Sequence, residues 1–205
     1  MDHAKEMKEK GADLLIKDLR KEFALNSGVV KRAVNDLTLG VNKGTIFGLL
    51  GMNGAGKTTT IKLVQGMMVP TAGDAVLEGI SCGSDPDAAR KLMGICPQHD
   101  VLWDELTARE HLTLYAKVRG IPEDKVEQAV NDMIKATKLE KHADKETHTY
   151  NGGSKRKLSI AIAMLGNPSC VFLDEPTTGL DPNTRRWVFL LWRGWEAGGC
   201  ASCNS

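Results

Sequence analysis

One stretch near the end of the first quarter of the chain has the spacing of a phosphate-binding loop. Residues 51–58, GMNGAGKT, satisfy G-x-x-x-x-G-K-[ST] at every fixed position. Glycines let such a loop wrap closely around an anion, so that its backbone N–H groups point inward. In this pattern Lys57 would reach the outer phosphates of a nucleotide, and the Thr58 hydroxyl would ligate Mg²⁺. The alternative is a glycine-rich turn that matches by chance.

Two adjacent acids provide a second group that could do chemistry. Asp174 and Glu175 directly follow the apolar run CVFL. A carboxylate at the end of a strand can hold the hydration shell of Mg²⁺, which is the role expected for Asp174. Glu175, one residue further on, could orient and polarise a water that attacks the terminal phosphate. The alternative is a pair of solvated acids, and the apolar run before them and the phosphate loop upstream argue against it.

The phosphate loop needs a strand before it and a helix after it. Residues 45–50, TIFGLL, predict a buried strand that leads directly into the loop. A helix should begin at Gly56 or Lys57, where its positive end adds to the anion site. Pro70 cannot continue a helix, so the pattern predicts an end near Met68. Its inner face would consist of Ile61, Val64 and Met68.

Three more helices and a second strand are predicted downstream. Thr107 and Glu110 have the spacing of a capping box that opens a helix through Ala116 or Val118. A second helix, after Pro122, has this apolar face: Val126, Val130, Met133 and Ile134. A third should run over residues 154–165 and stop at the sequence GNP. Residues 170–173 then predict a short, fully buried strand that ends at the acid pair. Turn signals at residues 26–28 and 42–44 predict loops between strands near the N-terminus.

The composition is that of an ordinary globular domain. The chain has 205 residues, a formal net charge of +1 and 41% hydrophobic residues, which gives no general reason to expect nucleic acid as a partner. Five cysteines form no regular framework, so reduced thiols are expected. No stretch reaches the roughly 18 apolar residues of a membrane span, and residues 1–10 have no signal-peptide pattern. We therefore expect a single domain that does not itself cross a membrane.

Three further motifs resemble those of one family, the ATP-binding cassette (ABC) ATPases. Residues 150–159, YNGGSKRKLS, resemble the family signature, and residues 94–100, GICPQHD, resemble its Q-loop. Residues 179–181, GLD, resemble the D-loop that follows the acid pair. The resemblance covers residues from about 15 to 186. Residues 96–98, 102–107, 110–112 and 155–159 are similar to the lipid-handling A subfamily.

The resemblance implies an α/β fold with a P-loop NTPase (RecA-like) core, an N-terminal antiparallel β portion and a helical insert at about residues 98–165. The nucleotide-binding domain would cover residues 1–186. In this family Glu175 is the catalytic base, Gln98 contacts the metal or the attacking water, and Lys57 contacts the phosphates. The metal residues would be Thr58, Gln98 and Asp174. Nucleotide contacts are implied for Gly51, Asn53, Gly54, Ala55, Gly56, Lys57, Thr58 and Thr59, and for the signature and D-loop residues Asn151, Gly152, Gly153 and Asp181. Phe23 matches the aromatic residue that stacks on adenine, with a core phenylalanine as the alternative.

The implied function is binding and hydrolysis of ATP with Mg²⁺ to power transport, with lipids as the cargo of the A subfamily. The implied partners are the transmembrane domains of a transporter and a second cassette in a head-to-tail dimer. No nucleic acid is implied, and the location would be the cytoplasmic face of a membrane. Physically, the signature is a helix N-terminus that faces an anion, while the basic residues 155–157 that follow are expected on a solvated face.

The sequence departs from the family pattern at two places. Asn151 stands where members usually have serine, and Ser154 where glutamine or asparagine is usual. The five histidines all precede Asp174, so none can be the switch histidine that follows the D-loop in this family. We therefore expect residues 187–205 to be an unrelated tail that replaces the final strands. Two alternatives stay open, a cassette that binds ATP without hydrolysing it and a soluble ABC ATPase outside transport.

Overall fold

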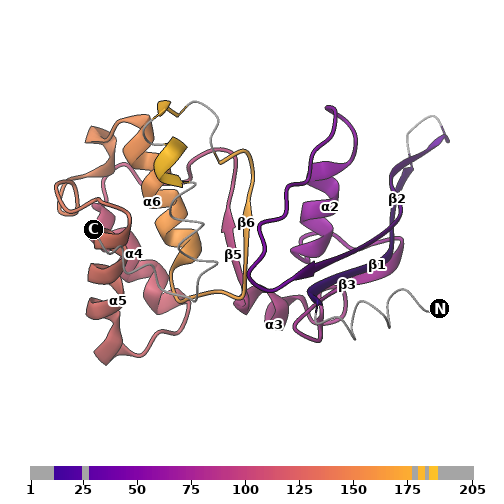
Figure 1. Ribbon diagram of the computed structural model, residues 1–205, viewed down its shortest axis with the longest axis horizontal. Helices are drawn as coiled ribbons and strands as arrows, with labels where there is room; N and C mark the ends of the chain where they lie inside the picture. Colours follow the sequence, from indigo (N-terminus) through magenta and orange to yellow (C-terminus); the bar gives the residue numbers. More distant parts are fainter. Residues whose placement is uncertain (1–11, 25–27, 177–179, 183–184, 189–205) are drawn as a thin grey trace. The chain divides into compact units, whose positions relative to one another are not determined.

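The computed structural model describes residues 12–24, 28–176, 180–182 and 185–188 (Figure 1). Parts of three predicted features lie outside these residues: the loop at residues 26–28, the D-loop glycine Gly179 and most of the expected tail. The chain divides into two compact units, Met1–Leu92 and Met93–Ser205. They are called here the N-terminal unit and the C-terminal unit, and each is described by itself.

The N-terminal unit contains a four-stranded antiparallel sheet in the order β2-β1-β3-β4. Its strands are β1 Ala12–Ala24, β2 Val30–Asn42, β3 Ala72–Leu77 and β4 Ile80–Ser81. Side chains alternate between the two faces of a strand, and this period places Leu14 and Ile16 of β1 and Ala75 and Leu77 of β3 in the core. The predicted antiparallel β portion is therefore confirmed.

Helix α2, Lys57–Val64, follows the glycine-rich loop and contacts β2 and β3. The predicted start is confirmed, but the predicted end near Met68 is wrong. Gly66 has φ 64° and closes the helix: its N–H donates to the Leu63 carbonyl, and the Met67 N–H reaches back to Lys62. These two hydrogen bonds together form a Schellman motif, which ends the helix before Pro70 is reached. The shorter helix buries Leu63 and Val64, whereas Ile61 and Met68 are only half-buried.

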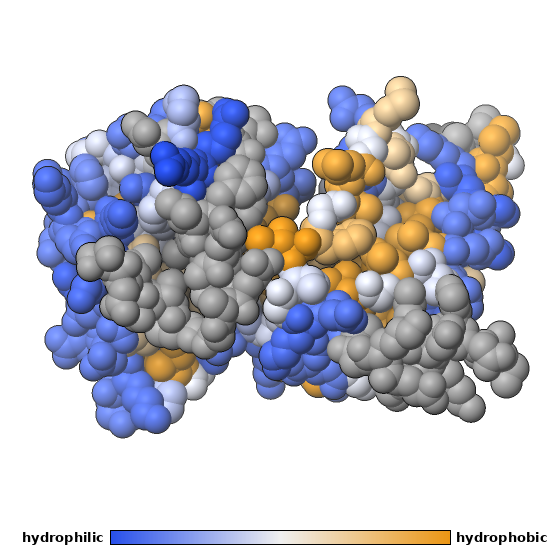
Figure 2. Space-filling view, viewed as in Figure 1, coloured by the Kyte–Doolittle hydropathy of each residue, from blue (hydrophilic) through white to orange (hydrophobic). Residues whose placement is uncertain are grey.

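Residues 45–50 do not form the predicted strand. They leave β2 through a turn at Lys43 and Gly44, and the structure gives them no strand partner among the described residues. Leu50 is 92% exposed and Ile46 is 53% exposed. Figure 2 shows the resulting hydrophobic surface on the N-terminal unit. An apolar run of this length indicates that the segment prefers burial, but it does not identify a neighbouring strand with which the segment could pair. The prediction of a strand was therefore wrong.

The C-terminal unit contains two paired parallel strands, β5 Met93–Cys96 and β6 Cys170–Leu173. Between them lie α4 Ala108–Val118, α5 Glu123–Ala136, a 3₁₀ turn at Thr147–Thr149 and α6 Gly152–Met164. Helix α3, Pro86–Lys91, belongs to the N-terminal unit. All three predicted helices of the insert, including the Thr107–Glu110 capping box, are confirmed. Strand β5 was not predicted, and β6 is half-buried rather than fully buried.

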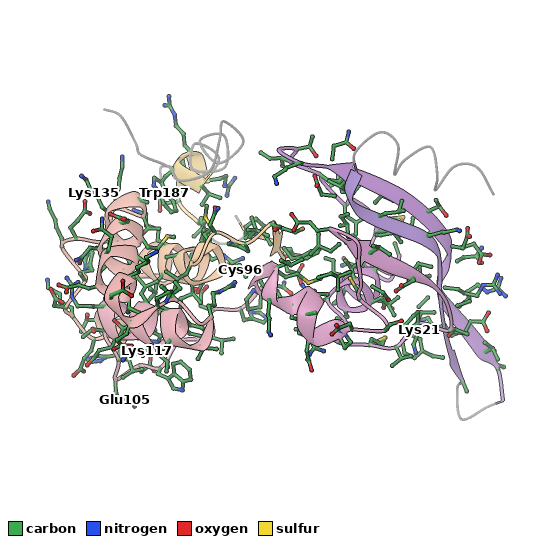
Figure 3. All side chains as sticks on the ribbon, turned by 90° about the horizontal axis from the view of Figure 1, so that it is seen from below. Lys21, Cys96, Glu105, Lys117, Lys135 and Trp187 are labelled. Atoms are coloured by element: carbon green, nitrogen blue, oxygen red, sulfur yellow. The ribbon has the colours of Figure 1, made fainter. Side chains whose placement is uncertain are left out.

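Two apolar clusters hold this unit together. One joins α4, α5 and α6 through residues such as Leu112, Val130 and Leu158. The other packs α6 against β5, β6 and the helical residues 185–188, with Val188 fully buried and Trp187 beside it (Figure 3). The first two residues of the expected tail thus belong to the packed structure.

The described cysteines are free thiols. Cys82 and Cys96 are buried, and Cys170 is half-buried. Burial raises the pKa of both the Cys82 and the Cys96 thiol to about 11. Within the described residues, no helix combines the length and the apolar character that a membrane crossing needs.

Candidate functional site

The glycine-rich loop, residues 51–56, is an exposed segment that leads directly into α2. Gly56 is the N-cap of the helix and has φ 92°. A Cβ atom at this position would lie 2.2 Å from the carbonyl oxygen of Ala33 in β2. Both the left-handed conformation and the close approach of β2 therefore require glycine here. The loop residues Gly51, Asn53, Gly54 and Ala55 are all exposed.

The N-terminus of α2 is open to an anion. No side chain caps it, and its first turn contains no acidic residue, so the positive end of the helix is not neutralised locally. Thr58 is exposed in this first turn and Thr59 is half-buried. The Lys57 ammonium group donates to the carbonyl oxygens of Gly51 (2.7 Å) and Met52 (3.0 Å). Lysine, loop and helix end thus form one compact group of donors, which suits a polyphosphate.

Phe23 lies near the end of β1 and is half-buried. The ammonium group of Lys21 lies 5.3 Å from the centre of its ring, a cation–π distance. An aromatic face that already attracts a cation and is partly open to solvent is able to stack on a base, so the adenine role of Phe23 stays a prediction.

In the C-terminal unit, the Q-loop and the acid pair meet at the ends of β5 and β6. The parallel pairing places Cys96 opposite Leu173, and the Asp174 N–H then donates to the Cys96 carbonyl at 3.0 Å. Beyond this point the Gln98 amide donates to the Glu175 carboxylate at 3.1 Å. Two predicted catalytic residues, 77 positions apart in the chain, are therefore brought together by two adjacent parallel strands.

Glu175 has an unusual backbone. Its φ is 45°, in the left-handed region that residues with a Cβ atom adopt only when the surrounding structure holds them there. Such residues are concentrated at functional sites. Five other described residues that are not glycine also have a positive φ, so the conformation shows that the surrounding structure holds Glu175 and does not by itself assign it a role.

The signature segment starts α6. Asn151 is the N-cap and accepts a hydrogen bond from the Ser154 N–H at 2.8 Å. Asparagine and serine are equally good N-caps, so Asn151 preserves the helix start despite its departure from the family. Gly152 is exposed and Gly153 is half-buried in the first turn.

The expectation of a solvated face for residues 155–157 is wrong. Lys155 pairs with Asp104 at 3.2 Å, and the Lys157 ammonium lies 5.1 Å from the Trp187 ring centre. Burial lowers the pKa of Lys157. Arg156 is only 3% exposed. Helical spacing could have revealed it, because residues 160 and 163, four and seven positions on, are both buried on the same face.

The remaining predicted site residues are distributed between the units. Lys57 and Thr58 belong to the N-terminal unit, whereas Gln98, Asp174 and the exposed Asp181 belong to the C-terminal unit. Within the part of the chain that the structure describes, no group of three or more His, Cys, Asp or Glu side chains could hold a metal by itself.

Comparisons with known proteins agree on one family. The family described as "ABC transporter" matches residues 34–178. Over 87% of this chain, the sequence is 47% identical to ATP-binding cassette sub-family A member 7 of Rattus norvegicus and 48% identical to the phospholipid-transporting ATPase ABCA3 of the same species. The chain spans only 8% and 10% of the length of these two relatives.

Solved structures show the same fold. An ATP-binding subunit of an ABC transporter aligns with a TM-score of 0.79 at 31% identity, over 91% of this chain and 76% of the other. A dimeric post-hydrolysis state of the cassette MJ0796, bound to ADP and Pi, aligns with a TM-score of 0.78 at 22% identity, over 89% of this chain and 82% of the other.

Proposed function

Because this chain belongs to the ABC transporter family and has the fold of its ATP-binding cassettes, we propose that it binds ATP with Mg²⁺ and hydrolyses it to drive transport by a larger membrane protein. The relatives include a protein named as a phospholipid-transporting ATPase, and we extend lipid transport to this chain as part of the proposal.

The observation that carries the proposal is the contact between Gln98 and Glu175 at the ends of β5 and β6. A carboxylate beside an amide can accept a proton from a water and fix the direction of its attack. Binding rests on the donors around α2, where Lys57 and the free helix N-terminus would hold the β- and γ-phosphates. Hydrolysis on this site depends on positioning and charge stabilisation rather than on a covalent enzyme intermediate.

Mg²⁺ is the ion proposed to accompany ATP. This ion is usually held by one or two carboxylates together with hydroxyl groups and substrate phosphates rather than by a cage of protein ligands. Thr58 and Asp174 supply such oxygen donors, and Gln98 supplies an amide oxygen. When bound, the ion would neutralise charge on the phosphate oxygens.

A second cassette is the proposed partner for catalysis. Gly152 is exposed in the first turn of α6, whose start is capped by Asn151, and a helix N-terminus is suited to the phosphates of a second nucleotide. In the proposed head-to-tail dimer, this signature would close over the ATP of the partner. The transmembrane domains of the transporter would receive the resulting motion.

The proposal is tested by measuring Mg²⁺-dependent ATP binding by calorimetry and phosphate release by the chain at increasing protein concentration. Turnover per chain that rises with concentration is expected, because dimerisation completes the site. Absence of ATP binding with and without Mg²⁺ would refute the proposal.

One observation favours a second candidate, ATP binding without hydrolysis. Asn151 places an amide where family members have a serine hydroxyl, and its side-chain oxygen is already engaged with the Ser154 N–H as the helix cap. Asn151→Ser restores that hydroxyl. Hydrolysis that is absent in the natural chain and present in Asn151→Ser would support the second candidate, whereas measurable hydrolysis at the same rate in both chains would exclude it.

A further inference from the structure

Arg156 makes an unusual set of contacts from the first half of α6. Its guanidinium group is buried and donates to four backbone carbonyl oxygens: Pro97 at 2.6 Å, Gln98 at 3.3 Å, Asp174 at 2.9 Å and Pro176 at 3.2 Å. The carboxylate of Asp100, at 3.3 Å, supplies the opposite charge. Asp100 in turn accepts a hydrogen bond from the Ser159 hydroxyl at 2.7 Å. The charge is therefore buried with a partner, and each of the three guanidinium nitrogens donates at least one hydrogen bond, as a buried arginine requires.

The four carbonyl groups lie just past the ends of β5 and β6. The strand pairing stops at Cys96 and Leu173 and is followed by one bond from the Asp174 N–H. Pro97 and Pro176 have no N–H and cannot continue a ladder as donors. Arg156 therefore joins the two chain segments at the place where the sheet no longer does so.

The groups that Arg156 joins surround the two catalytic candidates. It bonds the backbone of Gln98 itself and the residues on both sides of Glu175. Glu175 is the residue with φ 45°, a conformation that needs support from its surroundings. The Gln98–Glu175 distance of 3.1 Å thus depends on backbones that one side chain holds.

We propose that Arg156 is a positioning residue for ATP hydrolysis, which acts through Gln98 and Glu175. The inference rests on the proposed ATPase function. Lysine is not an equivalent replacement, because a single ammonium group cannot bridge four carbonyl groups that the planar, forked guanidinium reaches together.

The test compares Arg156→Lys with Arg109→Lys in the full chain. Arg109 is a matched control, because it belongs to α4 of the same unit and bonds Asp144 and Asn131 at the surface. For Arg156→Lys, turnover per ATP-binding site should fall about 10- to 100-fold, because small displacements of catalytic groups have effects of this size. The ATP affinity and the KM for ATP should stay within about twofold. Arg109→Lys should change neither quantity.

A second arm separates positioning from general structural support. In the Glu175→Gln background, Arg156→Lys should lower the residual turnover by less than about twofold, because the group through which it acts is already disabled. An equal loss in both backgrounds would overturn the inference, as would turnover of Arg156→Lys at the level of the control. Loss of ATP binding or of folding in Arg156→Lys would also overturn it.

Hydrogen exchange tests the positioning role of Arg156 independently of ATP turnover. Amides in residues 98–100 and 174–175 should exchange faster in Arg156→Lys than in Arg109→Lys, since their carbonyl neighbours lose a donor. Unchanged exchange would refute the positioning role. Absence of ATP hydrolysis by the natural chain would instead refute the proposed ATPase function, while the exchange result would still stand for the contact itself.

Discussion

The backbone N–H of Trp103 donates to Nε2 of His111 at 3.0 Å. Because Nε2 accepts, the proton of this imidazole lies on Nδ1, which faces the Thr107 carbonyl at 2.8 Å. His111 is fully buried in α4. It therefore ties the segment that follows the Q-loop to helix α4.

Replacing this histidine should destabilise the fold. His111→Phe keeps the ring but leaves the Trp103 N–H without its acceptor, and an unsatisfied buried donor costs about 1 to 3 kcal/mol. Urea denaturation should show that loss in the free energy of unfolding. The control His148→Phe alters a side chain that is 56% exposed and should have a much smaller effect. Equal effects of the two substitutions would contradict this account.

Lys57→Ala should abolish measurable ATP binding. Lys57 is the cation that the phosphate-loop motif places against the nucleotide, and losing a charge-assisted contact is costly. Lys62→Ala, in the last turn of the same helix, is the control for a change of charge and should bind ATP normally. Calorimetry on both variants checks the prediction. Undiminished affinity in Lys57→Ala would remove the basis for the phosphate-loop assignment.

Glu175→Gln should bind ATP but turn it over about 10² times more slowly or worse, because the amide keeps the shape and cannot accept a proton. The comparison is Glu127→Gln, an exposed position on α5, which should behave like the natural chain. Phosphate release and ATP affinity are measured on the same samples. Hydrolysis at the natural rate would reduce Glu175 to a strand-end acid.

Gly56→Ala should weaken both the fold and ATP binding. A methyl group would meet the Ala33 carbonyl oxygen at 2.2 Å, so either the loop or β2 must move. Gly79→Ala is the matched control, because Gly79 also has a positive φ, 84°, but has nothing within 4 Å of the added atom. The melting temperature should fall further for Gly56→Ala, and ATP affinity should fall only for that variant. Similar behaviour of the two variants would mean that the clash is relieved without consequence.

The capping box of α4 should make part of the stability depend on pH. Hydrogen bonds from the N–H and the hydroxyl of Thr107, each 2.8 Å long, lower the pKa of the Glu110 carboxyl below its ordinary value. A lowered carboxyl pKa stabilises the fold above the unfolded-state pKa, and this stabilisation is lost as the pH falls through the folded-state value.

Accordingly, the stability difference between the natural chain and Glu110→Gln should be largest near neutral pH and should shrink on acidification below about pH 4. Denaturation at a series of pH values measures it. A difference that grows with acidification would show that the assumed direction of linkage is wrong.

The sequence predicted those parts of the structure that depend on neighbours in the chain. The Thr107–Glu110 cap, the apolar face of α5 and the glycine-rich loop before α2 all need only a few residues to specify them. Glu175 was predicted from its place after an apolar run and Gln98 through family resemblance, and the parallel strands explain why the two side chains meet.

The parts that were missed depend on tertiary contacts. Gly66 ends α2 because its conformation and its neighbours close the helix, whereas the sequence pointed to the later Pro70. Residues 45–50 show only an apolar preference, which a sheet partner would have to satisfy. Because Arg156 is charged, the sequence alone predicts that it faces solvent. The carbonyl groups that bind it beyond the strand ends are brought together only by the tertiary fold.

The buried thiols of Cys82 and Cys96 can report on local opening of the structure. Cys82 belongs to the N-terminal unit and Cys96 to the C-terminal unit, and each is 1% exposed with a thiol pKa near 11. Only the thiolate reacts with alkylating reagents, so at neutral pH modification has to wait until the surrounding structure opens. Peptide-resolved alkylation rates at the two positions would therefore time the opening of the two units separately, within one sample.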